Sequence, residues 1–165
     1  MSPFRVEPLS GHDRAGFVSG SEPLDRYLKE LATQDIKRRV SNCFVAIDEG
    51  TGAVAGYYTF AAAGLPLTEL PDDLRKRLPR YGLMPAGLIG RLAVDAAYRG
   101  RGLGGALIMD AAMRASRAEP AIFALIVDAK DESAARFYEH HQFRRFASRP
   151  GSLFLPIATA LRAFG

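Results

Sequence analysis

The sequence predicts an α/β protein with a mixed central sheet. Two observations carry this prediction. In the first half, two β-type runs flank a glycine-containing turn, which is typical of an antiparallel hairpin. In the second half, the order is strand, helix and apolar strand, and such a crossover gives parallel pairing. The length of 165 residues and the hydrophobic content of 48% suffice for one core. No repeat or linker interrupts the chain, so we expect residues 1–165 to form a single domain.

The first half is expected to hold a strand, a helix and the hairpin. Residues 4–8 are a short apolar strand. Ser21 can cap a helix whose first turn tolerates Pro23. The apolar stripe of this helix has near-helical spacing and consists of Leu24, Leu28, Leu31 and Ile36. The expected hairpin has strands at 43–47 and 54–61 and a turn at 48–52.

The second half is expected to alternate strands and helices. Residues 66–81 form a charged excursion with one short helix at 72–78. The remaining elements are strands at 88–94, 121–127, 143–146 and 152–155, with helices at 102–117 and 131–141. The apolar segment 153–157 fits an edge strand, the core or an interface equally well.

The composition excludes several classes of protein. The single Cys43 rules out an internal disulfide framework and a multi-cysteine zinc site. We expect Cys43 to be a buried strand residue, and we expect the protein to bind no metal. We find no secretory signal and no apolar stretch of the ~18 residues that a spanning helix needs. The expectation is a soluble cytoplasmic protein without a membrane partner. The net charge is +4, and 18 of the 22 basic residues are arginine, which binds phosphate in a bidentate manner.

The main chemical signal is a glycine-rich segment, residues 99–105, between a strand and a helix. Its sequence is Arg-Gly-Arg-Gly-Leu-Gly-Gly. Glycines let the backbone approach a ligand, and the first N–H groups of the following helix are unpaired. Such a loop suits a phosphate or pyrophosphate. The simpler interpretation is a flexible turn that leads into a helix.

Two other anion-binding loops fit less well. A P-loop ends in Gly-Lys-Ser/Thr, whereas Ala106 and Leu107 follow the glycines here. The dinucleotide fingerprint matches Gly100, Gly102 and Gly105, and Asp128 ends the next strand where a ribose-binding acid belongs. In that fingerprint, however, the first glycine closely follows the strand, whereas residues 95–99 intervene here. The chain after residue 100 is also short for a dinucleotide fold.

A third family matches two separated motifs in the correct order. Residues 92–104 resemble the acetyl-CoA loop of the GNAT superfamily of N-acetyltransferases, with Arg99, Gly102 and Gly104 at its signature positions. Residues 134–143 are similar to the family's later Ala-x-x-Phe-Tyr segment, although Gln142 stands where glycine is usual. The resemblance implies a GNAT fold, in which splayed parallel strands of the mixed sheet surround an acetyl-CoA cleft with flanking helices. It implies acetyl-CoA as co-substrate, bound by Leu92, Ala93, Val94, Arg99, Gly100, Arg101, Gly102, Leu103, Gly104, Gly105 and Asp131.

A closer resemblance extends over nearly the whole chain. Segments at 17–20, 24–28, 56–59, 78–81 and 88–95 are similar to the GNAT toxins of bacterial toxin–antitoxin pairs. This implies acetylation of the α-amino group of aminoacyl-tRNA, which stops translation. It also implies a ribbon-helix-helix antitoxin that binds operator DNA, and a homodimer. The alternatives are a GNAT enzyme acting on a small amine or protein amino group, and a non-catalytic module that binds CoA or nucleic acid.

Tyr138 is the candidate general acid that the resemblance indicates. Its hydroxyl is neutral at working pH, because the reference pKa is ~10, and it could protonate the departing CoA thiolate. The alternative is one more aromatic side chain on an apolar helix face. The nearby Glu139, His140 and His141 are expected at the surface, and the base is left open. A strong base is unnecessary if the acceptor is an α-amino group, whose pKa is ~7.7–8.0.

The basic residues are grouped along the chain. Phosphate neutralisation by such groups would give salt-dependent RNA binding. One such group, near the end of the chain, is Arg144, Arg145 and Arg149. Arg91 lies on the strand that precedes the glycine-rich segment and is the first to test. The expected substrate-binding set is Arg91, Arg75, Lys76, Arg77, Arg80, Arg38 and Arg39.

Overall fold

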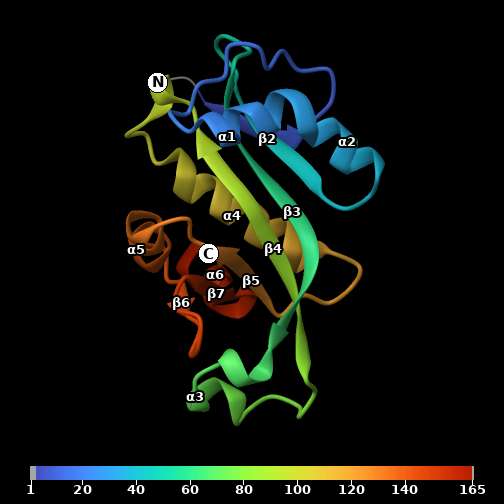
Figure 1. The fold of residues 1–165 in the computed structure, drawn as a ribbon, viewed down its shortest axis with the longest axis vertical. Coiled ribbons are helices and arrows are strands. Elements are labelled where there is room, and N and C mark those ends of the chain that lie inside the picture. The colour runs from blue at the N-terminus through green and yellow to red at the C-terminus, as the bar shows by residue number, and fades with distance from the viewer. Residues whose placement is uncertain (1–2, 165) are drawn as a thin grey trace. The chain divides into compact units, whose positions relative to one another are not determined.

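The computed structural model describes residues 3–164, which form an α/β fold around a seven-stranded mixed sheet (Figure 1). The strand order is β1-β2-β3-β4-β5-β7-β6. Two compact units share the chain: unit 1 runs to Ala61 and adds Ile89–Asp110, and unit 2 holds Ala62–Leu88 and the chain from Ala111 onward. Strands β3 (Val54–Pro66) and β4 (Leu83–Val94) contribute to both units. The predicted class and mixed sheet are confirmed, and the single domain stays a prediction.

Unit 1 begins with an antiparallel arrangement. Strand β1 (Phe4–Pro8) pairs with β2 (Asn42–Asp48), and β2 pairs with β3. The turn between β2 and β3 uses Gly52 at φ +76°, a left-handed conformation that favours glycine. The predicted hairpin is therefore confirmed. Strand β3 is longer than expected, because pairing continues through the small residues after Ala61.

The helix of unit 1 contains a π turn. It consists of α1 (Glu22–Arg26), the π turn η1 (Tyr27–Leu31) and α2 (Ala32–Lys37). The N–H of Ala32 donates to the carbonyl of Tyr27, five residues earlier. The predicted stripe is wrong at Leu31, which is 40% exposed, whereas Ala32 is buried. The π turn takes up one extra residue, so the buried position after it is Ala32 and not Leu31.

The helix start also differs from the expectation. Ser21 occupies the N-cap position, but its side chain makes no capping bond. The preceding serine acts instead: Ser19 accepts from the N–H of Ser21 and donates its hydroxyl to Asp25 at 2.6 Å. The serine-rich entry thus stabilises the helix start from outside the cap position.

The two faces of the sheet in unit 1 carry different layers. Tyr57 of β3 packs with Phe17, Tyr27 and Cys43 under α1 and the π turn. The neighbouring Gly56 faces the other way, where an added Cβ would lie 3.3 Å from a methyl group of Leu107 in α4 (Leu103–Arg117). Figure 1 shows α1 and α2 on one side of β2 and β3 and the beginning of α4 on the other. This alternation follows from the period of two in a strand.

Unit 2 contains the C-terminal strands. Strand β7 (Ser152–Pro156) lies between β5 (Ala124–Asp128) and β6 (Arg144–Arg145), antiparallel to both. All five residues of β7 are buried, so the undecided segment 153–157 is core. The chain then forms α6 (Ile157–Phe164), a helix that the sequence did not predict.

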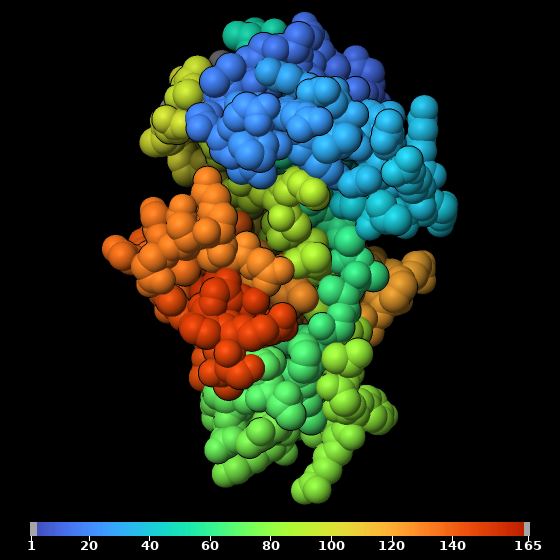
Figure 2. Space-filling view, in the orientation of Figure 1, coloured from blue at the N-terminus to red at the C-terminus, as the bar shows by residue number. Residues whose placement is uncertain are grey.

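Unit 2 also contains the charged excursion. It holds a 3₁₀ turn, Leu67–Glu69, and α3 (Asp72–Arg75), which is shorter than the predicted helix at 72–78. Figure 2 shows this segment in green at the surface. The carboxylate of Glu69 accepts from the N–H of Ser148 at 2.8 Å and from its hydroxyl at 2.5 Å, which keeps the pKa of Glu69 low. This contact fixes the excursion to the loop before β7.

Candidate functional site

The glycine-rich loop has the geometry of an anion-binding turn. Gly100 and Gly102 have φ of +79° and +74°, where a side chain would be strained. The 15-residue helix α4 begins directly after them. The N–H of Ala106 bonds to the carbonyl of Gly102, so the preceding N–H groups at the helix start have no intrahelical acceptor. Those N–H groups and the positive end of the helix dipole favour a phosphate.

The segment between β4 and the loop, residues 95–98, is an ordered turn held by hydrogen bonds. The carboxylate of Asp95 accepts from the N–H of Ala97 at 2.9 Å and from that of Val18 at 3.0 Å. It thereby holds the 3₁₀ turn Ala96–Tyr98, and the Tyr98 hydroxyl donates to Asp48 at 2.8 Å. This ordered turn separates the glycines from the strand, which the dinucleotide fingerprint does not allow.

The two arginines of the loop lie differently. Arg99 donates to the carbonyl of Ser19, and its guanidinium rests against Gly20. Arg101 lies with its guanidinium carbon 5.1 Å from the centroid of the Tyr98 ring. The Arg99 side chain thus ties the loop to the N-terminal segment, whereas Arg101 is exposed and can reach a ligand.

Strand β4 leads into this loop. Ala93 is buried in the core of unit 1, and Leu92 and Val94 are partly buried. Arg91 lies two residues before Ala93 and therefore on the same face of the strand. Its guanidinium carbon lies 3.6 Å from the centroid of the Tyr27 ring.

Tyr138 lies in unit 2, on α5 (Glu132–His140). Its ring is 8% exposed and meets Phe137 and Phe143 edge-on, with centroids 5.2 and 5.3 Å away. No bond to the hydroxyl is found within residues 3–164, and no fully buried side-chain oxygen there lacks a partner, so this oxygen keeps some contact with solvent. Burial raises the pKa of Tyr138 to about 12. The result is a fixed ring with a neutral hydroxyl available to a ligand.

Comparison with known proteins gives the family. Residues 39–145 match the acetyltransferase (GNAT) domain. The chain belongs to the GNAT acetyltransferase family. A relative from Mycobacterium tuberculosis named "tRNA-acetylating toxin" is 34% identical, with 93% of this chain and 91% of that protein covered. A Sinorhizobium fredii protein named "Probable toxin TacT" is 28% identical, covering 97% of this chain and 94% of its own.

Solved structures show the same fold. AtaT complexed with acetyl-methionyl-tRNAfMet has a TM-score of 0.87 and 26% identity, with 99% of this chain and 100% of that chain covered. A tyrosine-to-phenylalanine mutant of AtaT bound to the C-terminus of the antitoxin AtaR has a TM-score of 0.80, with 98% of each chain covered. At 24% identity, that likeness is one of fold.

Membership of the GNAT family makes this chain an acetyltransferase with acetyl-CoA as co-substrate. The loop fits that molecule, because two left-handed glycines and a helix N-terminus suit its pyrophosphate. Among residues 3–164, no three potential metal ligands lie together, and none of the helices there is long and apolar enough to cross a membrane.

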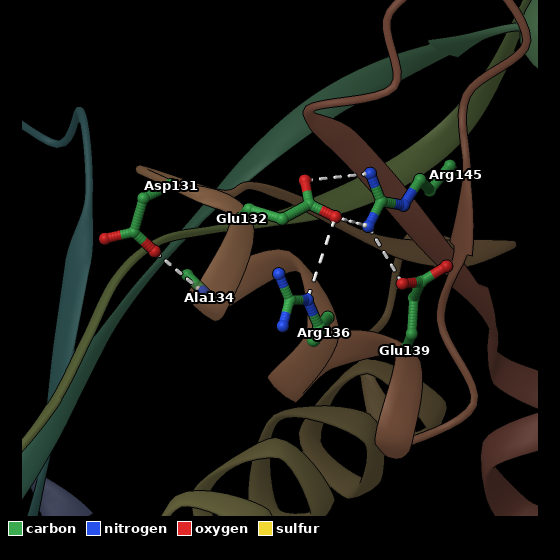
Figure 3. Close-up of polar contacts among 6 residues, drawn as sticks. All are labelled: Asp131, Glu132, Ala134, Arg136, Glu139 and Arg145. Atoms are coloured by element: carbon green, nitrogen blue, oxygen red, sulfur yellow. Dashed lines mark hydrogen bonds and ion pairs between the residues drawn. The ribbon is translucent and has the colours of Figure 1, made fainter.

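Helix α5 is held by ion pairs at both ends (Figure 3). Arg145 of β6 bonds to Glu132 in the first turn at 2.7 Å and to Glu139 in the last turn at 2.9 Å. Asp131 caps the helix by accepting from the N–H of Ala134 at 2.8 Å. Sequence reasoning assigned Asp131 to CoA and grouped Arg145 with RNA-binding residues. The structure gives both side chains a role in fixing the helix that carries Tyr138.

The remaining basic residues are only partly free. Arg75 pairs with Asp72, and Arg144 lies 3.4 Å from Asp73. Arg77 donates to the carbonyl of Asp73 at 3.2 Å. The other members of the expected substrate-binding set are exposed, and these are Lys76, Arg80, Arg38 and Arg39. Local acids therefore reduce the positive charge of the excursion.

Glu139 and His141 are poorly suited to act as a general base, and Cys43 is poorly suited to act as a nucleophile. Arg145 lowers the pKa of Glu139, so this carboxylate is a weak base. Burial lowers the pKa of His141, whose ring packs against Phe137 at 4.8 Å between centroids. Cys43 is 2% exposed and burial raises its pKa to about 12, which confirms the expected buried strand residue.

Proposed function

We propose that this chain transfers an acetyl group from acetyl-CoA to the α-amino group of aminoacyl-tRNA and acts as the toxin of a toxin–antitoxin pair. The observation that carries the proposal is the 34% identity to a tRNA-acetylating toxin across 93% of the chain. The left-handed glycine loop and the exposed arginines and lysine support it, because they suit a phosphate-bearing donor and acceptor.

In the proposed reaction, a C–N bond forms at the acceptor amine and the thioester C–S bond breaks. The loop N–H groups hold the donor pyrophosphate. The Tyr138 hydroxyl donates its proton to the leaving thiolate sulfur, the amine loses its own proton to water, and the tyrosinate then takes a proton back from water. An α-amino group has a pKa of ~7.7–8.0 and is largely neutral slightly above that pH, so no strong protein base is required.

The partners belong to the same proposal. We infer an antitoxin partner, since relatives over almost the full chain are named toxins. The resemblance found in the sequence favours a ribbon-helix-helix antitoxin that also binds operator DNA, and a homodimer in the cytoplasm. Size-exclusion chromatography with light scattering tests the dimer.

The decisive experiment supplies radiolabelled acetyl-CoA to the purified protein. Charged tRNA, the same tRNA deacylated, a polyamine and a lysine peptide serve as acceptors. We expect label only on charged tRNA. Label on the polyamine or peptide, with none on charged tRNA, would show that the enzyme acts on a small amine or protein amino group instead.

A further inference from the structure

Arg91 is an unpaired cation in a partly buried position. Within residues 3–164, no carboxylate or carbonyl bonds to its guanidinium, whose carbon lies 3.6 Å from the centroid of the Tyr27 ring. The charge also acts on the nearby Cys43 and Tyr57, neither of which is an anion at neutral pH. Partial burial of a charge without a counter-charge is costly. The structure thus keeps a cation ready for an anion that the protein itself does not supply.

Stacking determines where that cation points. The guanidinium lies over the ring face, and its N–H groups extend in its own plane, so they remain free to donate to an acceptor beside the ring. A planar fork of this kind matches a phosphate oxygen pair. A tyrosine beneath it therefore selects the direction from which an anion binds.

Tyr27 is itself held by its hydroxyl. It donates to Asp35 at 2.7 Å, and burial together with this bond raises its pKa. Its ring is 3% exposed and lies nearly parallel to that of Tyr57, at 6.4 Å between centroids. Tyr57 thus fixes the plane of the ring, and Asp35 fixes its hydroxyl.

The π turn makes the bond between Tyr27 and Asp35 possible. In a regular α-helix, residues eight apart lie about 80° apart around the axis. A π turn takes up one additional residue, so the two positions are related as if seven apart, about 20° from two full turns. The turn begins at Tyr27, and π turns frequently occur at functional sites. Tyr27 and Asp35 are thereby brought to one face.

We propose that Tyr27, fixed by Asp35 across the π turn, is a positioning residue that aims Arg91 at a backbone phosphate near the 3′ end of the acceptor RNA. This inference rests on the proposed function. We favour an RNA phosphate over the phosphates of CoA because the glycine-rich loop is already suited to bind the CoA pyrophosphate. Arg91 lies on β4, eight residues before that loop in the sequence.

The test compares three variants with a matched control. Arg91→Gln removes the charge, Tyr27→Leu removes the ring, and Tyr27→Phe keeps the ring but loses the bond to Asp35. Phe17→Leu is the control, because Phe17 belongs to the same core cluster and packs on Tyr57 without contacting Arg91. Thermal unfolding and the Kd for acetyl-CoA are measured for each protein, so that a folding defect is recognised.

We expect Arg91→Gln and Tyr27→Leu each to raise the Kd for tRNA about tenfold or more, the loss typical of a charged hydrogen bond. The double variant should be no worse than either single one. The slope of log Kobs against log salt should fall by about 0.7, the value for one single-strand phosphate. Tyr27→Phe should give a smaller change of the same kind, and Phe17→Leu none.

Two outcomes would overturn the inference. One is a raised Kd for acetyl-CoA with an unchanged salt slope for tRNA, which would assign Arg91 to the donor. The other is additive effects of Tyr27→Leu and Arg91→Gln, which would mean that the ring does not act through the guanidinium. Because uncharged tRNA suffices for these binding measurements, they remain informative even if charged tRNA accepts no acetyl group and the proposed function fails.

Discussion

At the scale of single residues, Tyr138 is largely buried, and its hydroxyl forms no bond within residues 3–164. We expect Tyr138→Phe to lower the rate of acetyl transfer by roughly 10²–10⁴-fold, the usual contribution of a general acid. Acetyl-CoA binding and the unfolding temperature should stay nearly unchanged, because the ring contacts remain. Single-turnover transfer and calorimetry measure these quantities. A fully active variant would remove Tyr138 from the mechanism.

The raised pKa of Tyr138 predicts a particular pH profile. The hydroxyl donates only while protonated, and a pKa near 12 keeps it so throughout the accessible range. The transfer rate should rise as the acceptor amine loses its proton, with a pKa of ~7.7–8.0 or below, and then stay level to about pH 10. A decline between pH 8 and 10 in the rate profile, with the fold intact by circular dichroism, would contradict this.

Gln142 adopts φ +76°, at the position where the resemblance to the GNAT segment leads one to expect glycine. A left-handed conformation costs a side-chain-bearing residue roughly 1–2 kcal/mol. We expect Gln142→Gly to stabilise the protein by about 1 kcal/mol, after allowance for the greater freedom of glycine in the unfolded chain. Urea unfolding gives the free energy, and Gln142→Ala, which keeps the strain, should show no gain.

At the scale of elements, α5 depends on Arg145. The guanidinium joins the first and last turns of the helix to β6, so its loss should loosen the element that carries Tyr138. We expect Arg145→Gln to increase amide exchange across residues 132–140 and to lower the transfer rate, while acetyl-CoA affinity changes little. Arg136→Gln is the control, because Arg136 lies on α5 itself and forms a longer ion pair with Glu132, at 4.0 Å. Equal exchange in both variants would refute the role of the bridge.

The sequence predicted most elements because their signals are local. The glycine-rich turn, the hairpin and the apolar strand β5 follow from turn chemistry and patterning, and all were found. The π turn is harder to recognise, because its sign is the spacing of five between the buried Tyr27 and Ala32, and the exposed Leu31 lies between them. The lengths of β3 and β4 were underestimated, because pairing with a neighbouring strand, which is non-local, decides where a strand ends.

At the scale of the whole molecule, the sequence predicted individual features of the candidate site but not which charged side chains pair with one another. Gly100 and Gly102 of the glycine-rich segment adopt left-handed conformations, and Cys43 is buried as expected. Charge was the weaker guide. Three arginines that were expected to face RNA each have an acidic partner instead. Arg145 pairs with Glu132, Arg144 with Asp73 and Arg75 with Asp72. Linear grouping of arginines does not reveal which carboxylates the fold places beside them.

The bonds of Val18 have a practical consequence for anyone who alters the N-terminus. Its N–H donates to Asp95 and its carbonyl accepts from Ala96, while Arg99 reaches the neighbouring Ser19. Val18 and Ser19 thus brace the glycine-rich loop and the turn before it from about eighty positions away in the sequence. Changes near Val18 and Ser19 that break these bonds should therefore lower the affinity for acetyl-CoA, although neither residue is expected to bind the co-substrate.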